Sequence, residues 1–444
     1  MKKLSFLLLS LILIGVSSCK KETVDVTDLL TTVPSSAAGV VVFNMEGLLE
    51  DAGCKIKGHE VIPGDVVKKA IEKNMAADRQ ELMMLFDGST GIEPKGAVIF
   101  YDSNRAFLTF ALYDETKFYE FIEKKNSAKF TDEGSGVKVC GNVAVKGSQA
   151  WVCLTTGKRI DADAIASYAT LGSARSFLVT PMGEKLLTDE EDIRGWAMIK
   201  TFADNLLSRQ DRSMFTLGLG FLFDGAESVC FEVDFKKGEL EAEAVVLNDK
   251  YKPAKYLLPA EKVDVSTLKT LGSTCDAMMA FTVTPKLIKK FEQIGAAFGG
   301  ALFGDLGETF RNIDGTVGIV SSGKGMAESI NGVVTTKGDV SKTLKDMISN
   351  YMGTVSMDGK LLKFSKGDVS GNLSVEECAS ELKGSFMGIV VDSRGYNELG
   401  TASGMASGFK TVVVKLKPES GGMEISVEAK TVNEKENVLQ TLLR

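Results

Sequence analysis

One cysteine near the start of the 444-residue chain stands in a pattern that suits a specific covalent modification. Residues 16–19 read Val16-Ser17-Ser18-Cys19. Small residues before a cysteine fit the site at which a bacterial signal peptidase cuts, and the thiol is the nucleophile that accepts diacylglycerol. The run therefore resembles a lipobox and predicts cleavage before Cys19 and lipidation of Cys19. The alternative is ordinary secretion, in which Cys19 is incidental.

The residues before Cys19 have the layout of a secretory signal peptide. Lys2 and Lys3 form a basic start, Leu4–Ile14 is apolar, and small residues follow. A helix that crosses the roughly 30 Å of hydrocarbon in a bilayer needs about twenty residues, whereas this stretch has about eleven. We therefore predict that residues 1–18 are a signal peptide that is removed.

Lipid on Cys19 would keep the mature chain at a membrane, because several acyl chains exceed the threshold for stable anchoring. Lys20 follows Cys19, whereas an aspartate at that position would resemble an inner-membrane retention signal. We therefore expect the outer membrane. Lys20-Lys21-Glu22 only partly resembles the acidic export tags of surface lipoproteins, so the periplasmic face and the cell surface both stay open.

The single histidine, His59, restricts catalysis. A Ser-His-Asp or Cys-His mechanism would have to route its proton through this residue, and motifs that need two histidines are excluded. His59 lies in the turn-rich run CKIKGHEVIPGD. We interpret it as an ordinary turn or surface histidine and predict no catalytic residue.

Two dense acidic runs could supply paired carboxylates. They are Asp189-Glu190-Glu191-Asp192 and the pair Asp161 and Asp163. Glycosidases place two carboxyl groups roughly 5 to 10 Å apart, a separation that a sequence does not reveal. The alternative is that both runs are solvated helix starts. Calcium is weakly supported because the EF-hand spacing is missing, so no metal or other cofactor is predicted.

Six further cysteines follow Cys19, an even number that permits disulfides in an oxidising compartment. They are Cys54, Cys140, Cys153, Cys230, Cys275 and Cys378. Several stand in strand-like runs, which favours unpaired core thiols. The best disulfide candidate joins Cys140 and Cys153 across a turn at Gly147-Ser148, although perfect register would pair Cys153 with Asn142. Zinc is disfavoured because no CxxC spacing exists.

Glycine is frequent, at 45 residues, yet it forms no phosphate-binding loop. Gly218-Leu219-Gly220 lacks the third glycine of a dinucleotide site, and GxxxxGK[ST] is absent. Residues 214–225 and 294–310 mix glycine with large apolar residues and are too short to span a bilayer. We interpret them as helices or loops packed on the sheets; the alternative is a mobile apolar lip that contacts lipid or a hydrophobic ligand.

Charge and composition exclude some classes of partner. Cleavage removes Lys2 and Lys3, so 50 basic residues face 59 acidic ones and the formal net charge changes from −7 to −9. An acidic surface without a long basic run argues against nucleic acid. With 44% apolar residues, the chain has the composition of an ordinary globular protein. Its mature length exceeds what one core usually holds, so two or more domains are expected.

The chain contains an internal duplication. Residues 33–53 parallel residues 271–291, with Phe43 over Phe281, and each segment has the pattern of a turn, a strand and a helix. Residues 95–103 match 314–322 in the same way. Residues 107–124 match 330–349, which places Phe118, Phe121 and Ile122 over Leu344, Met347 and Ile348. Asp114 and Asp339 are suited to start the two helices.

Alternating hairpins close both halves. They cover residues 229–248 and 411–431, with turns at Lys237-Gly238 and Gly421-Gly422. Strict alternation means that one face packs while the other meets solvent or a partner. We predict an α+β fold of two homologous halves, each with antiparallel sheets and hairpins packed by amphipathic helices. Residues 19–33 form a lipidated tether, and the halves cover residues 34–258 and 262–444.

The start VPSSAAGVVVFNMEGLLEDAG behind a lipobox, with DIRGW at 192–196 entering a strand, resembles a family of uncharacterised Bacteroidetes lipoproteins grouped as a domain of unknown function. The resemblance covers nearly the whole mature chain, but it rests on apolar structural patterns. It implies an envelope lipoprotein and supplies no functional residues.

These patterns together favour a non-catalytic, lipid-anchored envelope protein that presents sheet faces or loops to a protein or glycan partner. One alternative is an envelope hydrolase that uses a carboxylate pair between the halves. Another is a carrier of a hydrophobic ligand, which would need an internal apolar cavity lined by the Phe-rich stretches.

Overall fold

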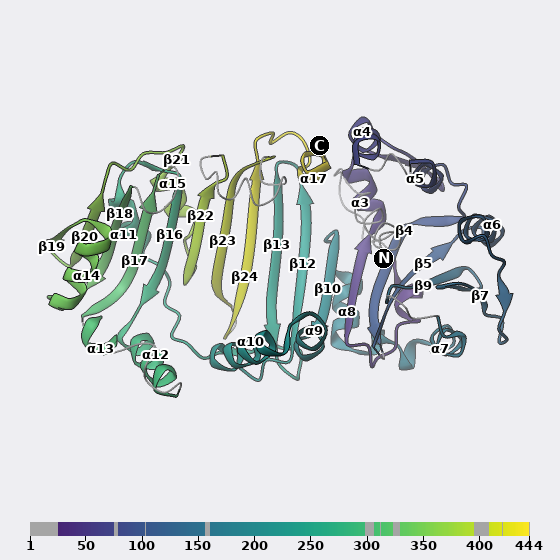
Figure 1. Ribbon diagram of the computed structural model, residues 1–444, viewed down its shortest axis with the longest axis horizontal. Helices are drawn as coiled ribbons and strands as arrows, with labels where there is room; N and C mark the ends of the chain where they lie inside the picture. Colours follow the sequence, from purple (N-terminus) through teal and green to yellow (C-terminus); the bar gives the residue numbers. More distant parts are fainter. Residues whose placement is uncertain are drawn as a thin grey trace. The chain divides into compact units, whose positions relative to one another are not determined.

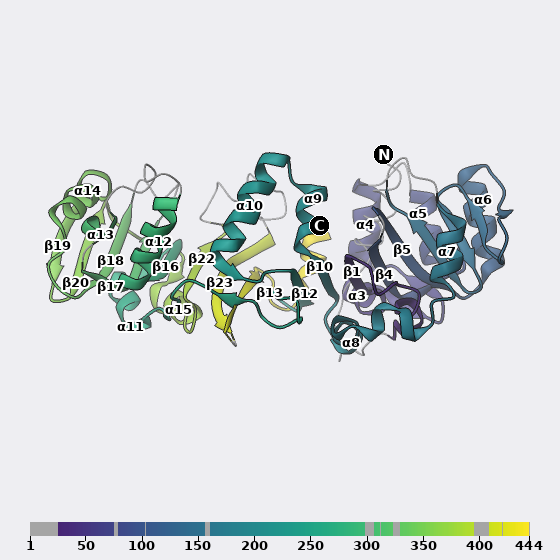
Figure 2. The same ribbon diagram turned by 90° about the horizontal axis from the view of Figure 1, so that it is seen from below.

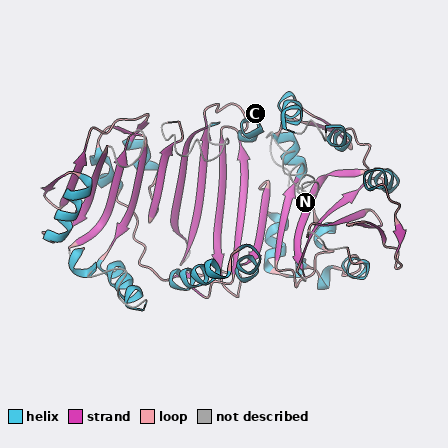
Figure 3. Ribbon diagram, viewed as in Figure 1, coloured by secondary structure: helices cyan, strands magenta, loops and turns pink. Residues whose placement is uncertain are grey.

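The computed structural model describes most of the chain. The described residues are 25–74, 79–102, 104–155, 160–297, 306–310, 312–322, 329–394, 408–419 and 421–443 (Figure 1). The predicted signal peptide and Cys19 lie outside them. The predicted α+β class is confirmed, since antiparallel strands and helices alternate along the chain (Figure 3).

The chain divides into two compact units whose boundaries differ from the predicted ones. Unit 1 comprises Met1–Leu206, Ser228–Leu240 and Asn433–Arg444, and unit 2 comprises Leu207–Glu227 and Glu241–Val432. These units differ from the predicted homologous halves, which meet near residues 258–262. The C-terminal helix α17 (Val438–Leu443) returns to pack against α4 (Asp65–Asn74), so the end of the chain belongs to unit 1.

The start of the described chain corrects the predicted tether. Residues 19–33 were expected to be an unstructured link, yet α2 (Thr27–Leu30) lies there. Val26, Leu29, Leu30 and Val33 are buried. Their spacing of three, four and seven residues puts them on one helical face, which is enough to anchor the segment on the core.

Unit 1 contains one antiparallel sheet. Its strands pair in the order β12, β10, β1, β4, β5, β9, β8, β7, β6. Their bounds are β1 Gly39–Asn44, β4 Ile92–Asp102, β5 Arg105–Leu112, β6 Thr131–Asp132, β7 Lys138–Cys140, β8 Val143–Lys146, β9 Gln149–Cys153, β10 Ile193–Met198 and β12 Ser228–Lys236. The separate hairpin of β2 (Lys55–Lys57) and β3 (Glu60–Ile62) forms a two-stranded sheet.

Helices cover both faces of this sheet. Phe118 of α6 packs edge-on against Phe110 of β5, and α7 packs through Tyr168 against Phe107 on the opposite face. The helices of unit 1 besides α2, α4 and α17 are α3 Met45–Asp51, α5 Arg79–Phe86, α6 Glu115–Asn126, α7 Ala162–Tyr168, α8 Pro181–Thr188 and α9 Ile199–Leu206, with short 3₁₀ turns η2 Ser173–Arg175 and η3 Phe177–Val179.

Unit 2 repeats this strand order. Its strands pair in the order β24, β23, β22, β16, β17, β18, β20, β19, and β13 lies beside β24. The bounds are β13 Glu239–Leu247, β16 Ala277–Val283, β17 Ile313–Ser321, β18 Ile330–Thr336, β19 Thr354–Asp358, β20 Leu361–Lys366, β22 Met387–Asp392, β23 Phe409–Glu419 and β24 Gly422–Thr431. Two short pairs, β11 (Phe223–Asp224) with β14 (Lys255–Tyr256) and β15 (Thr274–Cys275) with β21 (Leu373–Ser374), stand apart.

Helices again lie on both faces. Helices α11 and α15 enclose a core that includes Met278, Val390 and Val413, whereas α14 packs on Val317 and Val334 of the opposite face. Figure 2 shows α10 and α12 on the α14 side of the strands. The bounds are α10 Arg209–Leu222, α11 Val265–Leu268, η4 Lys269–Leu271, α12 Pro285–Ala297, α13 Leu306–Thr309, α14 Lys342–Met352 and α15 Val375–Glu381.

The repeated pairing corrects the predicted alignment by one residue. Phe43 pairs with Ala97 and Phe281 pairs with Val317, so Ala97 corresponds to Val317 and Gly96 to Thr316. The alignment of residues 95–103 with 314–322 had placed Ala97 on Thr316. Because a slip of one residue reverses the faces of a strand, only the observed register buries equivalent side chains.

The predicted helix caps and turns are partly confirmed. Asp114 caps α6 as predicted, but Ser341, not Asp339, caps α14. Met347 is 40% exposed, so it does not share the burial of Phe121. The turns at Gly147-Ser148 and Lys237-Gly238 are confirmed. The last turn falls one residue earlier than predicted, because Gly422 already pairs with Glu419.

Candidate functional site

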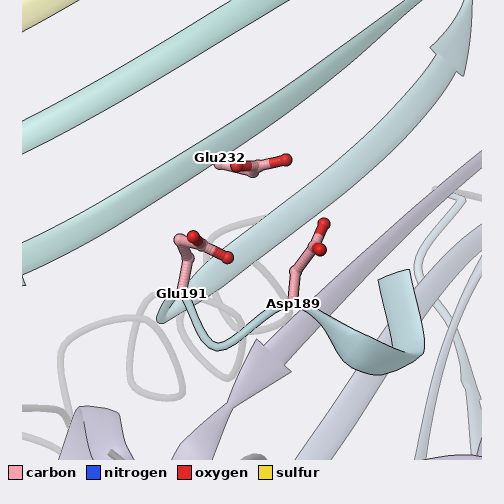
Figure 4. A group of neighbouring side chains, drawn as sticks. All are labelled: Asp189, Glu191 and Glu232. Atoms are coloured by element: carbon pink, nitrogen blue, oxygen red, sulfur yellow. The ribbon is translucent and has the colours of Figure 1, made fainter. Parts of the chain in front are cut away.

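The acidic run at residues 189–192 forms part of a carboxylate cluster in unit 1. Asp189 ends α8, Glu191 lies in the connection to β10, and Glu232 comes from β12 (Figure 4). One oxygen of each carboxylate lies within 4.8 Å of one oxygen of each of the others. Among the described residues, these three are the group of acidic side chains whose spacing could hold a metal ion.

Local structure explains which acidic residues join the cluster. Thr180 caps α8 and Pro181 occupies its first turn, so the helix begins there and ends at Thr188. The four acidic residues then fill the short connection to β10. Glu190 is exposed. Asp192 is buried and turns away, since its carboxylate accepts a hydrogen bond from the backbone N–H of Phe235 at 2.8 Å.

Glu232 was missed at the sequence level. Strands β10 and β12 pair so that Arg194 lies directly opposite Glu232, which brings Glu232 beside the connection. Its only sequence signal is its outward place in an alternating strand, and the pairing partner of that strand is not visible in the sequence.

Two cations lie among the three carboxylates. The Lys185 ammonium donates to Asp189 Oδ2 at 2.8 Å and also to Glu232 Oε1. Arg194 is fully buried, and its guanidinium donates to the carbonyl oxygens of Leu186 and Glu191, the latter at 3.2 Å. The Arg194 guanidinium therefore binds backbone carbonyls of both α8 and the connection that follows it.

The charges are unevenly compensated. Burial raises the pKa of Glu232 above its ordinary value, although the ammonium of Lys185 opposes this. Burial also works to lower the pKa of Lys185, but its hydrogen bonds to Asp189 and Glu232 raise that pKa overall. The raised pKa of Lys185 means that its charged form is stabilised, because the ammonium meets two carboxylates. The raised pKa of Glu232 means that its charged form is destabilised, because burial outweighs the one ammonium that it shares.

This arrangement favours a structural role. Three carboxylate oxygens at such distances could hold a divalent cation or act as an acid and base pair. However, Lys185 already donates to the carboxylates of Asp189 and Glu232, and the buried Arg194 adds a second positive charge. We interpret the cluster as an ion-pair network that fixes the end of α8 to the sheet.

The second acidic pair is a helix start. Asp161 caps α7 by accepting a hydrogen bond from the N–H of Ala164 at 3.3 Å, and Asp163 lies exposed in the first turn. Arg105 lies 3.5 Å from Asp161. The solvated helix start that the sequence suggested as the alternative is confirmed here.

His59 lies at the tip of the β2–β3 hairpin, as expected for a turn histidine. Its Nδ1 is 3.0 Å from Glu93 Oε2, and its ring stacks on Tyr113 with centroids 3.8 Å apart. The side chain is 47% exposed. Glu93 and Tyr113 are distant in sequence, so neither partner was predictable from the residues around His59.

The six cysteines after Cys19 are all buried and unpaired. The suggested bond between Cys140 and Cys153 is absent, because Cys140 pairs with Val143 and the N–H of Cys153 donates to the carbonyl of Asn142 at 2.9 Å. Burial raises the pKa of both Cys54 and Cys230 to about 11. Such thiols are poor nucleophiles, which agrees with the prediction of core thiols.

The two glycine-rich apolar segments are only partly described. Residues 214–222 belong to α10, on the α14 side of the strands of unit 2 (Figure 2). In the second segment, α12 ends at Ala297 and α13 begins at Leu306, and residues 298–305 lie outside the described residues. Among the described helices, none is both long and apolar enough to cross a membrane.

Comparison with known proteins assigns no family. No protein-family model matches the chain, and no curated protein matches it. Crystal form I of TP0453 has a TM-score of 0.29 and 11% identity, over 79% of this chain and 95% of that one. Crystal form III of TP0453 has a TM-score of 0.30 and 10% identity, over 79% and 96%. Similarity at this level supports no functional argument.

Proposed function

We propose that the protein is a non-catalytic, lipid-anchored envelope protein that binds the basic surface of a protein partner. The observation that carries the proposal is a charged sheet face in unit 2 that is buried at Lys415 and half exposed at Glu243. It consists of Glu243 on β13, Lys415 and Lys417 on β23, and Glu424 and Glu428 on β24. We call this set the acidic sheet face.

Strand register places these side chains together. Lys417 lies directly opposite Glu424, with 3.0 Å between the ammonium and the carboxylate, and Lys415 bonds diagonally to Glu428. Glu243 approaches Lys417 at 3.9 Å. The alternate residues Val414 and Ile425 point to the other face, where they are 36% and 38% exposed. The alternation expected of the hairpin is thus observed.

The charge of this face supports a basic partner. Three carboxylates face two ammonium groups, and Lys415 is nearly enclosed while Glu243 is half exposed. Burial, and then the neighbouring charge of Glu424, raise the pKa of Glu243. Lysine or arginine from a partner would relieve this accumulation of negative charge, whereas a neutral glycan would not.

The carboxylate cluster of unit 1 does not favour the hydrolase alternative. A catalytic pair needs carboxylates that meet a substrate, but Lys185 donates to both Asp189 and Glu232. Membrane attachment is proposed from the lipobox at residues 16–19 and from the length of the apolar stretch before it.

Site-specific photo-cross-linking in cells that make the protein tests the binding surface. A photoreactive residue at Glu419, which follows Lys417 on the same face of β23, should give one discrete adduct, and Glu243→Lys should remove it. The same photoreactive residue at Tyr351 of α14, which is 75% exposed, is the control. Equal adducts at both positions, or an adduct that Glu243→Lys does not change, would contradict the proposal.

Cell fractionation tests the anchor separately. The Cys19→Ala variant should leave the membrane fraction, and digestion of intact cells should show which side of the outer membrane the protein faces. Retention of Cys19→Ala in the membrane would show that the lipoprotein assignment is wrong and would leave the acidic sheet face untouched.

A further inference from the structure

Unit 1 contains a small apolar cavity beneath the β2–β3 hairpin. Its volume is about 60 Å³. Apolar side chains from α3, α5 and three strands form most of its wall, and Glu93 is its one charged residue. The lining includes Met45, Val61, Phe86, Glu93, Ala97 and Phe110.

The internal repeat shows why the cavity exists. Gly96 and Ala97 line it, and the corresponding residues of unit 2 are Thr316 and Val317. Val317 belongs to the core on which α14 packs. At the same place in the fold, unit 2 therefore fills space that unit 1 leaves open. Close-packed interiors keep few such voids, so the smaller side chains of unit 1 call for an explanation.

The β2–β3 hairpin covers the cavity, and Glu93 stands at its mouth. The hairpin that supplies Val61 forms its own two-stranded sheet and carries His59 at its exposed tip. His59 reaches Glu93 at 3.0 Å and stacks on Tyr113. These are the described side-chain contacts by which the tip meets the main sheet. A short polar contact thus holds an apolar cover in place.

We propose that this cavity binds a short aliphatic chain whose head group donates a hydrogen bond, an alcohol or a primary amine. The apolar walls take the chain. One oxygen of Glu93 faces His59, and the other is 4.0 Å from the exposed ammonium of Lys95, too far for a hydrogen bond. That oxygen can accept a hydrogen bond from a head group, so Glu93 favours an alcohol or an ammonium over a carboxylate. The His59 contact holds the hairpin closed over the bound chain.

Ligand-observed NMR with 1-propanol, propylamine and propanoate tests this site on the chain from residue 20 onward, because three-carbon chains match a volume of about 60 Å³. Propanol and propylamine should bind, and propanoate should bind more weakly than propylamine. Shortening the alcohol from three carbons to two should weaken binding about fourfold, the value expected for one buried methylene. Glu93→Gln should remove the preference for propylamine over propanoate.

The repeat itself supplies the decisive variant. Ala97→Val introduces the side chain of Val317 and should abolish propanol binding, whereas Ala111→Val, a matched change on β5 outside the cavity, should keep it. Should Ala97→Val not fold, Val61→Ile fills the cavity from the hairpin side and should weaken propanol binding instead. Equal binding by the cavity-filling and control variants, or equal affinity for propanoate and propylamine, would overturn the proposal. Neither result would affect the acidic sheet face.

Discussion

Replacement of Lys185 should destabilise unit 1 through the carboxylates it leaves behind. Lys185 donates two charge-assisted hydrogen bonds, and such bonds contribute about 1.5 to 3 kcal/mol each when buried. Asp189, Glu232 and Lys185 retain 22%, 22% and 39% exposure, so solvent screening reduces that value. We expect Lys185→Met to lower the free energy of unfolding by about 2 kcal/mol in total.

The pH dependence separates charge from packing. Glu232 has a raised pKa, so the folded state binds its proton more tightly than the unfolded state does. Stability therefore falls as pH rises from the ordinary value of 4.5 through the raised folded pKa. Lys185→Met removes the opposing charge and should widen this window. Its loss of stability should be larger at pH 8 than at pH 5.

Tryptophan fluorescence during urea unfolding measures this effect selectively. The chain has two tryptophans, Trp151 and Trp196, and both are buried in unit 1. Adding Glu232→Gln to Lys185→Met should restore about 1 kcal/mol, because one uncompensated carboxylate disappears. Lys129→Met, which breaks an exposed ion pair with Glu123 in the same unit, is the control and should not move the midpoint. An equal loss at both pH values, or no recovery on adding Glu232→Gln, would refute the network.

Three further outcomes follow from single contacts. Asn437→Ala should destabilise unit 1 by about 2 to 4 kcal/mol in the same fluorescence assay. Asn437 donates to the buried Asp51 carboxylate at 3.0 Å and to the carbonyl of Phe235 at 2.9 Å, and both bonds would be lost. An unchanged unfolding midpoint would contradict this prediction. Leu344→Ala should lower the free energy of unfolding by about 2 to 5 kcal/mol, measured by thermal circular dichroism, because Leu344 is buried. Met347→Ala should have almost no effect, because Met347 is exposed. Equal effects would show that Met347 is also part of the core. The six cysteines after Cys19 are buried and unpaired, so they should resist a thiol reagent in the folded chain from residue 20 onward, and all six should titrate in urea. Fewer than six titrated thiols in urea would show that a disulfide exists.

Periodicity and turn residues predicted the repeated elements well because those signals are local. The alternating hairpins and the helix capped by Asp114 need only neighbouring residues to be recognised. The same reasoning overlooked α2, where Val26, Leu29, Leu30 and Val33 have helical spacing, because a helix of four residues is formed by packing more than by its own propensity.

Long-range contacts account for the remaining errors. The alignment of residues 95–103 slipped by one because several apolar residues in succession fit either register, and only pairing with β1 selects one. The compact units differ from the predicted halves because Asn437 binds Asp51 and Phe235, residues far earlier in the chain. Glu232 joined the candidate site for the same reason, since its position beside Glu191 depends on the pairing of β10 with β12.

The repeat also gives a reason to seek the binding surface in unit 2. Arg194 lies opposite Glu232 in unit 1, and at the corresponding positions of unit 2 Gly388 lies opposite Lys415. In unit 1 the charge on the outer strand meets Lys185 of α8 and stands beside the buried Arg194, so that face is occupied internally. In unit 2, Gly388 offers no side chain and Leu382 packs closely over it, so Lys415 turns to Glu428 instead. Helix α15 also packs on this face of unit 2, where Lys430 of β24 donates to Glu381 at 2.7 Å. A partner would therefore meet the face at the half-exposed Glu243 of β13.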